Sequence, residues 1–192
     1  MIKKFSFACV ALSLAALTSA GAQAAMTAAP TLKVGDVAPD FTVAAVTKDG
    51  LAKPFQLSAH KGETVVLAFF PKARTSGGTA QMHAYRDQYD QLFMGGKKVT
   101  LVGVSVDSDT ALISWARDDN FTFQFASDVD RKVGMAYGAN LGTGSHKRLL
   151  YVIDPKGNIS YIAAPFRQMA AEAYTDLGAA IVQANVQAKG MK

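Results

Sequence analysis

The chain has 192 residues, of which 49% are hydrophobic and 18% are charged, a balance typical of a folded globular protein and not of a disordered one. The net charge of +5 includes two lysines at the N-terminus, and the other basic residues are interleaved with acidic ones. We therefore expect a solvated surface and no nucleic-acid partner.

The first 24 residues have the three parts of a secretory signal peptide. Lys3 and Lys4 form a basic start, and residues 5–17 form an apolar stretch that is too short to span a bilayer. Ala22-Gln23-Ala24 then provides a small-x-small cleavage site. We predict a signal peptide over residues 1–24, cleaved near Ala24, and export to a bacterial periplasm or medium.

The rest of the chain begins with a short lead-in over residues 25–33, which we predict to be flexible, and continues as one domain over residues 34–192. The first half of this domain shows the signals of a hairpin, a buried strand and a helix. Expected elements are a strand in 40–48, a turn at Asp49-Gly50, a returning strand in 54–58, a buried strand in 63–70 and a helix from Thr79 to Gly95-Gly96.

The second half alternates buried strands with amphipathic helices. Expected elements are a strand in 98–107, a helix capped by Ser108 and running to about 118, a strand in 122–127, a short helix in 128–137, a strand pair in 148–154 and 158–164, and a helix over 168–187. This order predicts one α/β domain, with a mixed sheet flanked by helices on both faces.

Residues with reactive or metal-binding side chains are few. The only cysteine is Cys9, inside the predicted leader, so the processed protein would have no thiol, no disulfide and no cysteine–metal bond. His60, His83 and His146 lie far apart along the chain without ligand spacing, and we expect surface histidines, no metal and no cofactor. No apolar stretch after residue 25 is long enough to span a membrane.

Several sequence blocks occur in the order found in one known family. They are VGDVAPDFTV (34–43), LSAHKGETVVLAFFPKARTSGGT (57–79), LVGVSVDS (101–108), FASDVDRKVGMAYG (125–138) and KRLLYVIDPKGNISYI (147–162). Together they resemble the peroxiredoxins of the alkyl hydroperoxide reductase and thiol-specific antioxidant family, bacterioferritin-comigratory type. The resemblance implies a thioredoxin-like fold that begins with a β-hairpin.

In that family the reactive loop reads Pro-x-x-x-Thr-x-x-Cys, and the cysteine thiolate attacks the peroxide bond. Pro71 and Thr75 match the shielding proline and the threonine that hydrogen-bonds the reacting oxygens. Arg148 matches the arginine that stabilises the thiolate. Residue 78, however, is glycine where the resemblance places the peroxidatic cysteine, and His83 stands where some members have a resolving cysteine.

This departure changes the expected chemistry. Reduction of a peroxide by this route needs a thiolate, so we expect no catalytic residue and no thiol peroxidase turnover. What remains is the end of a helix, where Pro71, Thr75, Gly77, Gly78 and Arg148 would form a small anion-binding pocket, with space left by the missing side chain. The alternative is that Thr75 only caps the helix, Arg148 pairs with a carboxylate, and the cleft is unused.

Three functions follow from these readings. The first is an exported peroxiredoxin-like protein, not a peroxidase, that binds a small anion, an oxidised molecule or a protein partner at the vestigial site. The second is an antioxidant oxidoreductase that uses an external thiol, a metal or another residue such as His83. The third is a structural or interaction protein. Ligand identity and oligomeric state are left open by the sequence.

Overall fold

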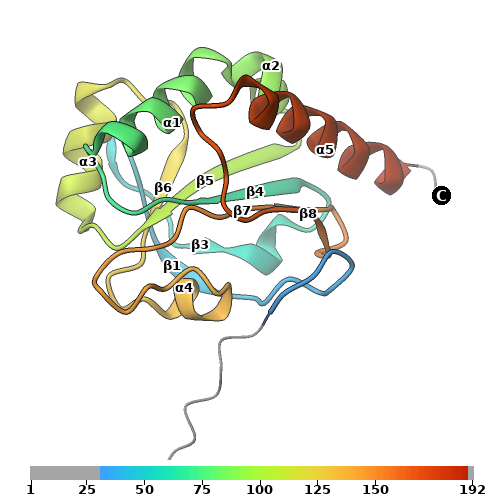
Figure 1. The fold of residues 1–192 in the computed structure, drawn as a ribbon, viewed down its shortest axis with the longest axis horizontal. Coiled ribbons are helices and arrows are strands. Elements are labelled where there is room, and N and C mark those ends of the chain that lie inside the picture. Colours follow the sequence, from blue (N-terminus) through green and yellow to red (C-terminus); the bar gives the residue numbers. More distant parts are fainter. Residues whose placement is uncertain (1–30, 190–192) are drawn as a thin grey trace, which may run out of the picture.

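A computed structural model describes residues 31–189, so the predicted leader and most of the predicted lead-in lie outside the described residues. Its centre is an eight-stranded mixed sheet in the order β2-β1-β6-β5-β4-β7-β8, with β3 paired to β1 (Figure 1). The strands are β1 (Thr42–Thr47), β2 (Gly50–Leu51), β3 (Phe55–Gln56), β4 (Thr64–Phe69), β5 (Val99–Ser105), β6 (Gln124–Ser127), β7 (Leu150–Ile153) and β8 (Ile159–Ala163).

Helices cover both faces of the sheet, but unequally. They are α1 (Ser76–Asp87), α2 (Tyr89–Phe93), α3 (Asp109–Asp118), α4 (Lys132–Ala136) and α5 (Ala171–Lys189), with the short 3-10 helices η1 (Leu57–His60) and η2 (Met94–Gly96). One core cluster lies between the sheet and α1, α2, α3 and α5, and a second lies on the face of α4 and η1 (Figure 1). The predicted sheet with helices on both faces is therefore confirmed.

The central strand β4 determines the position of the loop between β4 and α1, which contains Pro71 and Thr75 of the predicted pocket. All six of its residues are buried, as its continuous apolar sequence predicts. It runs parallel to β5 and antiparallel to β7, so the end of β4 and the start of β7 meet at one edge of the sheet. The Phe69 N–H donates to the Leu149 carbonyl at 2.8 Å, which places Arg148 beside the loop that leaves β4.

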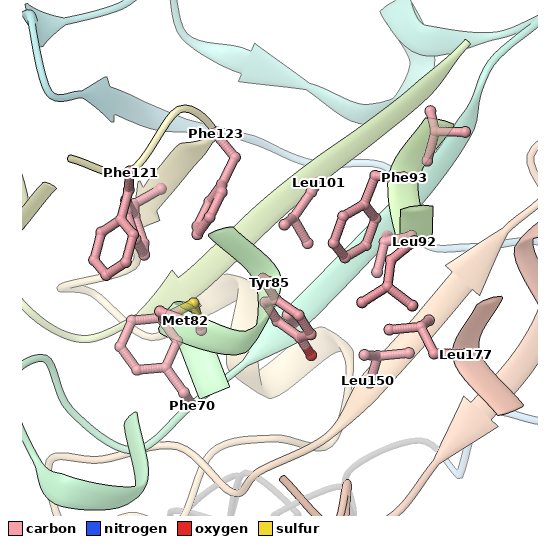
Figure 2. Packing of buried hydrophobic residues seen from close by; sticks show 14 of the residues in the cluster. Phe70, Met82, Tyr85, Leu92, Phe93, Leu101, Phe121, Phe123, Leu150 and Leu177 are labelled. Atoms are coloured by element: carbon pink, nitrogen blue, oxygen red, sulfur yellow. The ribbon is translucent and has the colours of Figure 1, made fainter. Parts of the chain in front are cut away.

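The first helix differs from its predicted extent at both ends. It begins at Ser76 and not at Thr79, because Thr75 serves as its N-cap. It also stops at Asp87, and a separate helix α2 follows Gln88. Figure 2 shows Met82 and Tyr85 of α1 and Leu92 and Phe93 of α2 packed over the sheet in the same cluster. The apolar spacing thus predicted the buried face correctly but not the break within it.

The prediction that His146 lies at the surface is wrong. Its side chain is fully buried, its Nε2 lies 2.9 Å from Asp128 Oδ2, and its ring packs edge-on against Phe69 at 5.7 Å. Asp128 also accepts hydrogen bonds from the N–H groups of Val133 and Gly134 at 3.0 and 2.7 Å. Asp128 therefore binds the first free N–H groups of α4 and orients a buried histidine as well.

No helix among residues 31–189 is both long enough and apolar enough to cross a membrane.

Candidate functional site

The loop between β4 and α1 is closed by its own threonine. Thr75 Oγ1 accepts a hydrogen bond from the Gly78 N–H at 3.2 Å and donates one to the Lys72 carbonyl at 2.9 Å. The first of these bonds is the usual cap of a helix N-terminus. Because the single hydroxyl proton of Thr75 is already donated to the Lys72 carbonyl, Thr75 has no further proton to donate to a ligand in this conformation.

Gly78 is buried, and the position that a side chain would occupy is already filled. A Cβ added there would lie 2.7 Å from the Lys72 carbonyl oxygen and 2.9 Å from Thr75 Oγ1. The first contact is with backbone, so the loop itself would have to move. The expected space beside Gly78 is therefore absent: the carbonyl of Lys72, next to Pro71, occupies it.

Two side-chain contacts fasten the same loop to the rest of the domain. Asp107 Oδ2 accepts from the Ala73 N–H at 2.7 Å and from the Ser105 hydroxyl at 2.9 Å. Arg74 forms an ion pair with Asp118 of α3. Asp107 can hold the loop because it follows the end of β5, which is paired to β4.

Arg148 lies over the start of α1, half-buried, and its neighbour there is an amide. Its Nη1 donates to Oε1 of Gln81, a completely buried residue of α1. Desolvation lowers the pKa of the Arg148 guanidinium, yet an arginine remains charged at neutral pH. Within residues 31–189 no carboxylate lies at ion-pair distance from it, so the alternative that Arg148 pairs with an acid is wrong for the described part of the chain.

The donors converge over Gly77, one residue before the predicted centre of the site. A Cβ added to Gly77 would lie 3.0 Å from Arg148 Nη2 and 3.0 Å from Gln168 Nε2. Gln168 belongs to the segment between β8 and α5, and sequence reasoning missed it. Its only signal in the sequence would have been a polar residue at the start of a predicted helix, which marks a cap far more often than a ligand contact.

His83 contacts residues that follow α3. Its Nε2 lies 3.2 Å from Asp119 Oδ2, at the end of α3, and its ring centre lies 5.9 Å from that of Phe121. His60 pairs with Glu63 at 3.1 Å and stacks on Phe55. In the described residues no group of three or more His, Cys, Asp or Glu side chains could hold a metal ion.

Comparison with known proteins gives the family. Residues 34–162 match the AhpC/TSA family. The chain belongs to this peroxiredoxin family. It is 31% identical over 144 residues to peroxiredoxin Bcp of Escherichia coli K12, which covers 71% of this chain and 88% of that protein. It is 35% identical over 130 residues to chloroplastic peroxiredoxin Q of Triticum aestivum, which covers 67% of this chain and 57% of that one.

Solved structures confirm the peroxiredoxin fold. Peroxidoxin BcpB from Mycobacterium tuberculosis aligns with a TM-score of 0.67 and 25% identity, over 80% of this chain and 98% of that one. A cysteine-to-serine mutant of Xylella fastidiosa PrxQ aligns with a TM-score of 0.68 and 20% identity, over 81% and 99% of the two chains. The predicted thioredoxin-like fold and the resemblance to the bacterioferritin-comigratory type are thus confirmed.

Proposed function

We propose that this protein is an exported member of the peroxiredoxin family that lacks peroxidase activity and binds a small oxyanion at the N-terminus of α1. The absence of peroxidase activity rests on residue 78, a glycine, and on the absence of any cysteine after Cys9. Without a sulfur nucleophile, the family's attack on a peroxide bond has no attacking atom. The export rests on the leader over residues 1–24.

The charge of Arg148 is the observation that carries the proposed binding function. A half-buried guanidinium is normally stabilised by a carboxylate, and here its partner is the neutral amide of Gln81. The same guanidinium lies over the first turn of α1, whose N–H groups carry partial positive charge. These two positive groups repel each other, so an oxyanion between them would relieve the repulsion and accept their hydrogen bonds.

Anion titration of the purified protein tests this proposal. Formate and sulfate, added at constant ionic strength, are expected to give saturable shifts of the Gly77 amide signal in NMR spectra. The Arg148→Ala variant is expected to weaken this binding by about tenfold or more, since a charged hydrogen bond is lost.

The matched control is Lys147→Ala, which removes the same charge from an exposed neighbour of Arg148. Its affinity for anions is expected to stay within about twofold of the wild type, because exposed charges contribute little. Equal weakening in both variants would indicate a general charge effect, and no saturable shift in the wild type would contradict the site itself.

The second candidate function is an antioxidant oxidoreductase that uses another residue in place of the cysteine. The position of His83 does not favour it. His83, the residue offered as a substitute, lies against Asp119 and Phe121 and not among the donors over Gly77. A structural or interaction protein with an unused cleft is the outcome if neither anion binding nor peroxide turnover is found.

A further inference from the structure

A pocket lies at the start of β4, at the opposite end of this strand from the loop that leads into α1. Its volume is about 300 Å³, and residues 37–40, η1, the first residues of β4 and the turn after β7 surround it (Figure 1). Backbone hydrogen bonds of 2.9 Å join these segments, from the Ala38 N–H to the Gly157 carbonyl and from the Gly62 N–H to the Pro155 carbonyl. We call it the distal pocket, and its shape is fixed by the fold.

The floor of the distal pocket is apolar. Four of the residues that line it are buried and belong to the core: Ala38, Leu57, Val65 and Ile153. An apolar group placed here would displace water from side chains that are already held in position, so little has to be ordered on binding. A pocket of this volume, with an apolar floor and a few polar side chains, has the properties of a small-molecule site.

Glu63, at the edge of the pocket, is held by two neighbours through one of its oxygens. His60 Nδ1 lies 3.1 Å from Glu63 Oε2, and the Thr100 hydroxyl donates to the same oxygen at 3.0 Å. Hydrogen bonding from His60 lowers the pKa of Glu63, so its carboxylate is ionised at neutral pH. Both contacts use Oε2, and neither occupies the lone pairs of Oε1. Glu63 is therefore a positioned negative charge that can accept a further hydrogen bond.

Two more carboxylates line the pocket in a similar way. Asp154 Oδ1 accepts the N–H groups of Lys156 and Asn158, each at 2.9 Å, and these bonds do not use Oδ2. Asp40 Oδ1 accepts the Ser58 N–H at 2.9 Å, and hydrogen bonding from the Ser58 side chain lowers the pKa of Asp40. With histidine counted as neutral, the lining has three carboxylates and two lysines, an excess of one negative charge: Asp40, Glu63, Asp154, Lys61 and Lys156.

We propose that the distal pocket binds a small organic amine with an apolar body. The ammonium group would donate to Glu63 and Asp154, and the apolar body would cover the buried floor. An ammonium has three donors and no acceptor, so it matches carboxylate oxygens that have lone pairs left. Its single positive charge offsets the excess negative charge of the lining, whereas a carboxylate of the same shape would add to it. This site is separate from the oxyanion site proposed at α1, and neither depends on the other.

Phenethylamine is the probe, because it joins a charged amine to an apolar ring. Added to isotope-labelled protein at constant ionic strength, it is expected to give saturable shifts of the Gly62, Val65 and Gly157 amide signals in NMR spectra, while the Gly77 signal stays in place. Phenylacetate has the same ring with the opposite charge, and methylamine has the same charge without the ring. Each of these two compounds is expected to bind about fivefold or more weakly than phenethylamine.

Glu63→Gln and Asp154→Asn are the decisive variants. Each keeps an oxygen for the hydrogen bonds within the protein and removes the negative charge, so each is expected to weaken phenethylamine binding by about three- to tenfold. Asp49→Asn is the matched control, because it makes the same change at an exposed residue of the turn between β1 and β2. It is expected to bind phenethylamine as the wild type does. Circular dichroism of each variant checks that it is folded.

The possible contrary results are distinct. Equal weakening in Asp49→Asn would indicate a general charge effect and would overturn the assignment to Glu63 and Asp154, as would unchanged binding in both Glu63→Gln and Asp154→Asn. Phenylacetate that binds as tightly as phenethylamine would contradict the choice of an amine. Methylamine that binds as tightly would contradict the role of the apolar floor. If phenethylamine gives no saturable shift, the distal pocket is no amine site.

Discussion

Replacing Gly134 with alanine is expected to lower the free energy of unfolding by about 2–4 kcal/mol. An added Cβ at this position in α4 would lie 2.2 Å from Cε1 and 2.6 Å from Nδ1 of the buried His146. The ring cannot withdraw without breaking its contact with Asp128, which also receives the Gly134 N–H. Urea denaturation followed by circular dichroism measures the change.

Gly178→Ala provides the control in a second helical glycine. A Cβ added there would meet only Leu92, at an ordinary distance of 3.5 Å. Because alanine favours a helix interior over glycine, this variant is expected to gain about 0.5–1 kcal/mol. If both variants behaved alike, the close packing of His146 over Gly134 would be wrong.

Gly78→Cys is expected to have two effects, one on stability and one on reactivity. The new Cβ must displace the Lys72 carbonyl from its position, which should cost about 1–3 kcal/mol. Once the loop has moved, the thiol lies at the N-terminus of α1 near Arg148, where positive charge lowers a thiol pKa. We therefore expect a thiolate that reacts with hydroperoxide and forms a sulfenic acid.

Ser76→Cys is the matched control, because residue 76 lies in the same turn but is exposed. The absorbance of the thiolate as a function of pH gives the two pKa values, and peroxide consumption gives the two reactivities. We expect a lower pKa and faster reaction at position 78. A thiol at position 78 that titrates like a free cysteine would show that Arg148 and the helix end do not act on this position.

Much of the fold was predictable because its signals are local. The apolar run of β4, the hairpin turn predicted at Asp49-Gly50 and the cap at Ser108 each depend on neighbouring residues. The structure has the strand and the cap as predicted, and its turn lies one residue earlier, at Lys48-Asp49. The break at Gln88 was not predictable in the same way, since the apolar spacing continues through Phe93. Tyr89 stacks on Phe123, and Phe93 packs edge-on against Tyr85, so tertiary packing sets the course of the chain there.

The candidate site was likewise predictable only in part. The cap formed by Thr75 follows from its sequence spacing to Gly78, and the place of Arg148 followed from the family resemblance. The contact between Arg148 and Gln81 joins residues 67 positions apart, and Gln168 approaches Gly77 from the far side of β8. Nothing in the local sequence marks either glutamine, because a neutral amide is notable only when the charge it faces is known.

Hydroperoxide consumption by the purified wild-type protein tests the central claim most directly. With dithiothreitol or thioredoxin as reductant and no added metal, the protein with Gly78 is expected to consume hydrogen peroxide no faster than the buffer does. The Gly78→Cys variant in the same assay shows that turnover would be detected. Catalytic decay of peroxide by the wild type would contradict the claim that this member of the peroxiredoxin family binds oxyanions without reducing peroxides.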